Sequence, residues 1–188
     1  MVLYSVELMV HEHDNILKLL TVMRKACCNV LDGEEVNEAD FRLMIDFARN
    51  YADKHHHGKE EQILFAEMTQ HLGQIAVNLI QHGMLVEHDL GRLHISEMET
   101  ALNQYQQSPE TKYKLEIIAG AAGYANLLER HIGKENEIVY TYAEKNLAPE
   151  LLVSVDERVK EFEQKAEQNQ VQNKYLQSLE LLVSKYLG

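Results

Sequence analysis

Two halves of this sequence repeat each other at an offset of 75 residues, which restricts the folds that the chain can adopt. The eight residues that begin at His56 match the eight that begin at His131 at five positions. In both halves, another histidine stands 43 residues before this segment. The flanking matches pair Met9, Glu12, His13 and Asp14 with Met84, Glu87, His88 and Asp89. We therefore expect two similar units that pack face to face about an approximate twofold axis.

The composition and the apolar spacing of both units are typical of helices. Gly and Pro account for only 9 and 2 of the 188 residues, and apolar residues recur at helical spacing, as at Val6, Val10 and Leu17. Turn residues such as Gly33 and Gly73 separate the periodic segments. The predicted helices cover approximately residues 3–31, 38–70, 75–107, 110–146 and 149–187, and a polar run favours a break in the last one near Asn169.

The sequence thus predicts an all-α fold. Residues 1–147 are expected to form an antiparallel up-down-up-down four-helix bundle made of two pseudo-symmetric helical hairpins. Residues 148–188 are expected to form a C-terminal extension, one helix or a helix pair, packed on the bundle within a single domain.

Charge and cysteine content exclude several classes of function. The formal net charge is -12 and the 18 basic residues are scattered, so nucleic acid is not expected as a partner. Charged residues interrupt the apolar pattern of residues 1–25, so we expect neither a signal peptide nor a membrane segment, and a cytoplasmic location. Cys27 and Cys28 are adjacent on a helix, which favours two reduced thiols over a disulfide.

The repeated histidines and glutamates have the spacing of metal ligands. Residues four apart share one face of a helix, so His56 with Glu60, and His131 with Glu135, can each grip one site. His13 and His88 lie on the apolar stripes of the first and third helices. Burying these groups is costly unless a cation binds them. We predict a dinuclear metal centre held by His13, His56, Glu60, His88, His131 and Glu135, with the two carboxylates as bridging ligands.

The repeat also ranks the other candidate residues. Six histidines have no repeat partner, so surface or structural roles are expected for them: His11, His55, His57, His71, His82 and His94. The alternative for His82 or His94 is a place near an opening to the site. Tyr124 stands two helical turns before His131 and either approaches the metals or packs in the core. Glu12 and Glu87 either orient ligand histidines or face solvent. Lys59 and Lys134 are expected to be solvated or to neutralise nearby acidic charge.

With these residues in view, the sequence resembles the hemerythrin-like (HHE cation-binding) family of non-haem di-iron proteins, in its bacterial type, over residues 3 to about 146. Ferritin-like bundles use Glu-x-x-His, which this sequence lacks. Oxygen-carrying hemerythrins have a fifth histidine where Met84 stands, and an aspartate five residues after the fourth-helix histidine, whereas Glu135 follows His131 by four. A simple oxygen carrier is therefore disfavoured.

The resemblance implies two iron ions in an Fe–O–Fe type centre, although zinc and manganese also suit these ligands. The leading functional hypothesis is a protein that binds O2, NO or peroxide for sensing, scavenging or storage. The alternatives are a di-iron enzyme that reduces O2 or NO or decomposes peroxide, with an electron donor as partner, and an iron donor for the repair of iron centres, with an iron acceptor as partner. No catalytic residue beyond the metal ligands is predicted.

Overall fold

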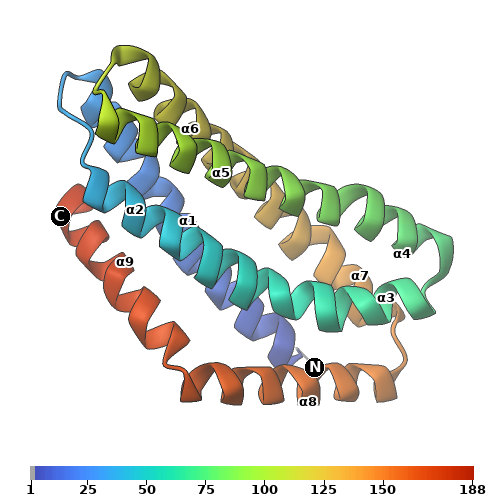
Figure 1. Ribbon diagram of the computed structural model, residues 1–188. Coiled ribbons are helices and arrows are strands. Elements are labelled where there is room, and N and C mark those ends of the chain that lie inside the picture. Colours follow the sequence, from blue (N-terminus) through green and yellow to red (C-terminus); the bar gives the residue numbers. More distant parts are fainter. Residues whose placement is uncertain (1–2) are drawn as a thin grey trace.

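Four long antiparallel helices form the bundle, as the apolar stripes predicted, in the computed structural model, which describes residues 3–188 (Figure 1). The first is α1 (Tyr4–Leu31). The second comprises α2 (Glu38–Phe47), η1 (Ala48–His57), η2 (Glu60–Leu64) and α3 (Phe65–His71). The third comprises α4 (Gly73–Leu79), η3 (Ile80–Met84) and α5 (Leu85–Gln107). The fourth comprises α6 (Thr111–Lys134), η4 (Glu135–Val139) and α7 (Tyr140–Asn146).

Short turns divide the bundle into the two predicted hairpins. Gly33 has a φ of 105°, a left-handed conformation that glycine adopts without strain, and it follows the end of α1. The Asn37 side chain then caps α2 by accepting a hydrogen bond of 3.2 Å from the backbone N–H of Asp40. Between the two hairpins only Leu72 separates α3 from α4, and Gly73 has a φ of 68°. The second and third helices therefore reverse direction almost without a loop.

The segments η1 to η4 are π-helical, and two of them obey the sequence repeat. η2 begins at Glu60 and η4 begins at Glu135, exactly 75 residues later. π-helical turns widen a helix locally and are frequent at functional sites. In these turns, the backbone N–H of the residue five positions after each glutamate bonds to the carbonyl oxygen of that glutamate. Each of the two glutamates therefore begins a π-helical turn.

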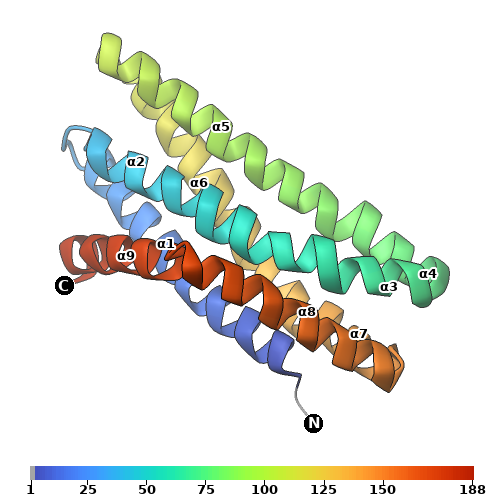
Figure 2. The same ribbon diagram turned by 60° about the horizontal axis from the view of Figure 1, so that its bottom comes forward.

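A helix pair, α8 (Pro149–Gln168) and α9 (Val171–Leu187), follows the bundle. The break falls at Asn169 and Gln170, where Gln170 has a φ of 52°. The pair runs along the outer side of the first hairpin, beside α1 and the second helix, in both views (Figures 1 and 2). Its apolar residues join both core clusters of the bundle: Val155 and Val159 from α8, and Tyr175, Leu179 and Leu182 from α9.

None of the helices formed by residues 3–188 combines the length and the apolar character needed to cross a membrane. The two thiols differ in environment, since Cys27 is buried in the core and Cys28 is exposed.

Candidate metal centre

The structure brings the six predicted ligand residues together in the interior of the bundle. One histidine comes from each of the four helices, and a glutamate comes from the second and the fourth. All six side chains are buried: His13, His56, Glu60, His88, His131 and Glu135. Their polar atoms fall into two neighbouring groups.

The first cluster consists of His13, His56, Glu60 and Glu135, whose candidate ligand atoms all lie within 4.8 Å of one another. His13 Nε2 lies 3.2 Å from Glu135 Oε2, and His56 Nε2 lies 3.7 Å from Glu60 Oε2. This cluster therefore offers two imidazoles and two carboxylates to one point.

The second cluster consists of His57, His88 and His131, again with ligand atoms within 4.8 Å. His88 Nε2 and His131 Nε2 are 3.0 Å apart. The glutamates of the first cluster also reach this one, since His131 Nε2 is 3.0 Å from Glu135 Oε1 and His88 Nε2 is 3.6 Å from Glu60 Oε2. Both carboxylates thus lie between the two clusters, where a bridging ligand has to be.

His57 is the residue that the repeat argument passed over. We expected a surface or structural role because Ile132 stands at its repeat position. Instead His57 is buried and stacks on His88, with ring centroids 3.7 Å apart and planes 7° apart. Its position directly after His56, in a π-helical turn, aims it at the second cluster while His56 faces the first. The run of three histidines was the available signal.

Each of the four repeat histidines has an oxygen acceptor on its outer nitrogen, Nδ1. Glu12 Oε2 lies 2.8 Å from His56 Nδ1, and Glu87 Oε2 lies 2.9 Å from His131 Nδ1. The other two acceptors are Asn136 for His13, at 2.8 Å, and Glu61 for His88, at 2.7 Å. Such contacts fix the tautomer and leave Nε2 free to face a metal. Glu12 and Glu87 therefore orient histidines rather than face solvent, and Asn136 and Glu61 occupy matching repeat positions that the sequence reasoning did not use.

Aromatic rings pack against the centre at another pair of repeat positions. The Tyr140 ring stacks on His13 at 5.7 Å, and the Phe65 ring stacks on His88 at 6.0 Å. The Tyr140 hydroxyl also donates a hydrogen bond of 2.5 Å to Glu60 Oε1. Extending the repeat five residues beyond each glutamate identifies both rings, since Phe65 and Tyr140 are 75 residues apart.

Without a metal, the buried charges in the centre compete with one another. Burial, together with the neighbouring Glu135 carboxylate, raises the pKa of Glu60 well above its usual range. Burial opposes charge on His131, yet the Glu135 carboxylate raises the pKa of His131 to about 10. Burial lowers the pKa of His56 to about 4, so this imidazole is neutral. Without a metal, the centre therefore favours the neutral form of Glu60 and the protonated form of His131.

The donor set fits a cation. Within residues 3–188, five buried polar atoms of the centre have no hydrogen-bond partner: His13 Nε2, His56 Nε2, Glu60 Oε2, Glu135 Oε1 and Glu135 Oε2. Buried polar atoms are normally paired, so this group of unpaired acceptors calls for an explanation. All five face the space between the ligand side chains, and imidazole nitrogens and carboxylate oxygens are common ligands of transition metals.

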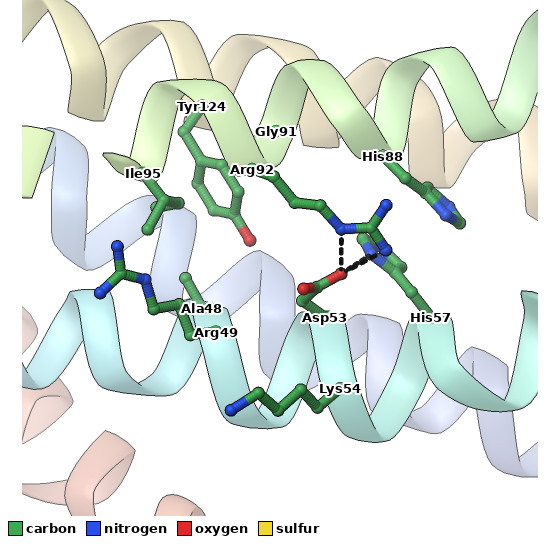
Figure 3. A pocket seen from close by; sticks show the side chains of 10 residues that line it. All are labelled: Ala48, Arg49, Asp53, Lys54, His57, His88, Gly91, Arg92, Ile95 and Tyr124. Atoms are coloured by element: carbon green, nitrogen blue, oxygen red, sulfur yellow. Dashed lines mark hydrogen bonds and ion pairs between the residues drawn. The ribbon is translucent and has the colours of Figure 1, made fainter. Parts of the chain in front are cut away.

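A pocket of about 320 Å³ leads from the surface to the second cluster (Figure 3). His57 and His88 lie at its inner end, and the Tyr124 hydroxyl points into it. Arg92 reaches across from α5 and binds Asp53 at 2.7 Å and Glu61 at 2.7 Å. Tyr124 thus lines the approach to the centre, and Arg92 holds the carboxylate that orients His88.

The remaining histidines lie outside the two clusters. His11, His71 and His82 are exposed, and the half-buried His94 ring lies against Gly123 beside a different surface pocket. The pocket in Figure 3 is lined by neither His82 nor His94. His55 is buried beside Glu12, with its Nε2 atom 3.0 Å from Glu12 Oε1.

Comparison with known protein families agrees with this geometry. The sequence model of the Hemerythrin HHE cation binding domain matches residues 4–143, which is nearly the whole four-helix bundle without α8 and α9. A search of curated proteins finds no individual match. The chain belongs to the hemerythrin HHE cation-binding family.

Proposed function

We propose that this protein holds two iron ions and binds a small ligand such as O2, NO or peroxide, for sensing, scavenging or storage. One metal position is assigned to His13 and His56, the other to His88, His131 and His57, with Glu60 and Glu135 bridging both. The observation that carries this proposal is the set of unpaired Nε2 and carboxylate atoms between the two clusters. A pair of iron ions would supply a redox-active centre that binds such ligands.

Iron is proposed over zinc because zinc has no redox chemistry with which to bind O2 or NO, and over manganese because five imidazoles and two carboxylates form a nitrogen-rich set. The pocket supports the small-ligand part of the proposal. Its cavity of about 320 Å³ has room for a diatomic molecule or peroxide, and Tyr124 places a hydroxyl donor along the path. The buried rings of Phe65 and Tyr140 exclude water from the opposite sides of the two clusters.

Metal analysis with Mössbauer spectroscopy tests the centre. We expect two irons per chain and a coupled pair signal, and a loss of metal in His56→Ala and in His131→Ala. Fewer than two metals per chain, with content unchanged in both variants, would refute the dinuclear centre.

Stopped-flow mixing of the reduced protein with O2 or NO tests the function. A stable, reversible ligand spectrum is expected. Multiple turnovers with an electron donor would instead identify a di-iron oxidoreductase, and rapid transfer of iron to an apo-acceptor would identify an iron donor.

A further inference from the structure

The repeat builds the same arrangement of histidine, glutamate and lysine twice. In the first triad, Glu12 accepts a hydrogen bond from His56 Nδ1 with one oxygen and binds the Lys59 ammonium with the other. In the second triad, Glu87 does the same with His131 Nδ1 and Lys134. Each triad orients a proposed ligand histidine from outside the centre.

The surroundings of the two triads differ sharply. The Lys59 side chain is 0% exposed and that of Glu12 is 1%, whereas the Lys134 side chain is 42% exposed and that of Glu87 is 20%. Of the two roles expected for Lys59, the structure therefore supports neutralisation of nearby acidic charge and not solvation. Water can solvate the ammonium of the second triad, but the buried ammonium of the first triad needs protein groups to stabilise its charge.

The C-terminal helix pair covers the first triad. Phe162 of α8 lies over Gly58, where a Cβ atom would be 3.6 Å from the ring, and the Lys59 ammonium is 5.8 Å from the ring centroid. Glu163 Oε1 binds Lys59 Nζ at 2.5 Å. From α9, Gln172 donates a hydrogen bond of 2.5 Å to the other oxygen of Glu163. Both helices lie outside the residues that the family model matches.

Glu163 is a second carboxylate partner of Lys59, besides Glu12. A buried ammonium with one carboxylate partner draws that carboxylate strongly toward itself. Glu12 has to serve Lys59 and His56, and His55 Nε2 lies 3.0 Å from its Oε1 atom and 3.3 Å from Glu163 Oε1. A second carboxylate on this side of Lys59 therefore leaves more of the Glu12 charge for the His56 proton. Outer partners of this kind strengthen a histidine as a metal ligand.

We propose that Glu163 is a positioning residue for the first metal position: through Lys59 and Glu12 it fixes His56, so that this metal is retained more firmly than the one beside His88 and His131. The inference rests on the proposed metal centre. By this proposal, the C-terminal helix pair stabilises only one of the two repeat-related metal sites, so the two sites retain their metals unequally.

Metal release from the full chain loaded with two irons tests this role of Glu163. With excess chelator, the wild-type protein is expected to lose its metals in a fast and a slow phase. Glu163→Gln should speed the slow phase about tenfold, the lower end of the range for outer partners of a ligand histidine, and leave the fast phase unchanged. Glu87→Gln should speed the fast phase only.

Glu161→Gln is the matched control, because Glu161 lies on the same helix and is exposed. It should change neither phase. Equal acceleration of both phases in Glu163→Gln, or no acceleration, would overturn the proposal. The link through Lys59 is tested in a Lys59→Met background, where Glu163→Gln should have no further effect on the slow phase. A full effect there would also overturn it.

Solvent exchange of the imidazole protons in the metal-free protein gives a readout that needs no metal. In Glu163→Gln, the His56 Nδ1 proton should exchange at least tenfold faster by NMR, with the His131 Nδ1 proton unchanged. A chain that takes up no metal would refute the proposed centre, while this comparison still decides the role of Glu163. Unchanged exchange at His56 would refute that role.

Discussion

At the scale of single residues, the centre buries two carboxylates that repel each other, and a cation bound between them would offset this repulsion. Glu60 and Glu135 present two carboxylates to the same buried space, and five imidazole rings surround them. The four repeat histidines are held by oxygen acceptors outside the centre, so their Nε2 atoms have little freedom to turn away. The fifth, His57, has a weaker outer contact, 3.4 Å to Asp53.

Metal binding should release protons. Burial and Glu135 raise the pKa of Glu60 well above the usual carboxylate range. Glu135 raises the pKa of His131 to about 10, so near pH 7.5 His131 holds a proton in the metal-free protein. Ligation requires the carboxylate and the neutral imidazole, so at least the His131 proton should leave as both sites fill. Calorimetric titration in phosphate and in Tris checks this, since the two buffers take up protons with different enthalpies. Equal apparent enthalpies in the two buffers would contradict it.

His57 should behave as a metal ligand that a small molecule can replace. His57→Ala is expected to weaken one of the two metal sites at least tenfold, because an outer partner alone contributes about that much. The pocket reaches His57, so millimolar imidazole should enter the space and restore metal binding. His94→Ala serves as the control and should keep both metals. Full metal affinity in His57→Ala, or a loss that imidazole does not rescue, would show a packing role instead.

At the scale of elements, the apolar stripes predicted the four helices and a helical extension, one helix or a pair, because burial of one face is enough to define a helix in a bundle. They did not predict the π-helical turns, since residues four apart share a face in the ordinary helix as well. His57 was missed because the criterion of a repeat partner rejects a residue that aligns with Ile132. The burial of Lys59 depends on Phe162 and Glu163, which the spacing of the first hairpin does not reveal.

Two glycines of the second hairpin should respond oppositely to alanine. A Cβ atom at Gly120 would lie 2.9 Å from Met98 Cβ and 3.0 Å from the His94 carbonyl oxygen, where α5 and α6 approach most closely. Gly120→Ala should lower the free energy of unfolding by about 1–3 kcal/mol. Within the described chain nothing lies within 4 Å of a Cβ atom at Gly83, so Gly83→Ala should raise it by about 0.5–1 kcal/mol. Urea unfolding at equal metal content measures both, and the same sign for both would contradict this packing.

At the scale of the whole molecule, the C-terminal pair and the bundle share their interior. Val159 of α8 packs in the core cluster that contains Phe65, and Leu179 of α9 packs in the core cluster that contains Phe47. The pair therefore contributes to both clusters of the bundle. The match to the family model ends at residue 143, but the hydrophobic core includes residues of the C-terminal pair beyond it.

The chain should therefore unfold in one transition. Leu179→Ala should destabilise the whole protein by about 2–5 kcal/mol, since Leu179 is 3% exposed, while Leu181→Ala, at a residue 69% exposed on the same helix, should change little. Circular dichroism and tyrosine fluorescence should give coincident denaturation curves for each variant. A separate early transition in Leu179→Ala would show that residues 149–188 form an independent unit.

The tight reversal at Leu72 and Gly73 has a consequence for how copies of this chain can exchange parts. Each cluster draws on both hairpins: the first takes Glu135 from the second hairpin, and the second takes His57 from the first. The left-handed φ of Gly73 lets the second and third helices turn back on each other here. If this turn straightened, the two hairpins of one chain would move apart, and each would find its complement in another copy. Both proposed metal sites of such a domain-swapped dimer would then be assembled across the two chains, with every proposed ligand retained.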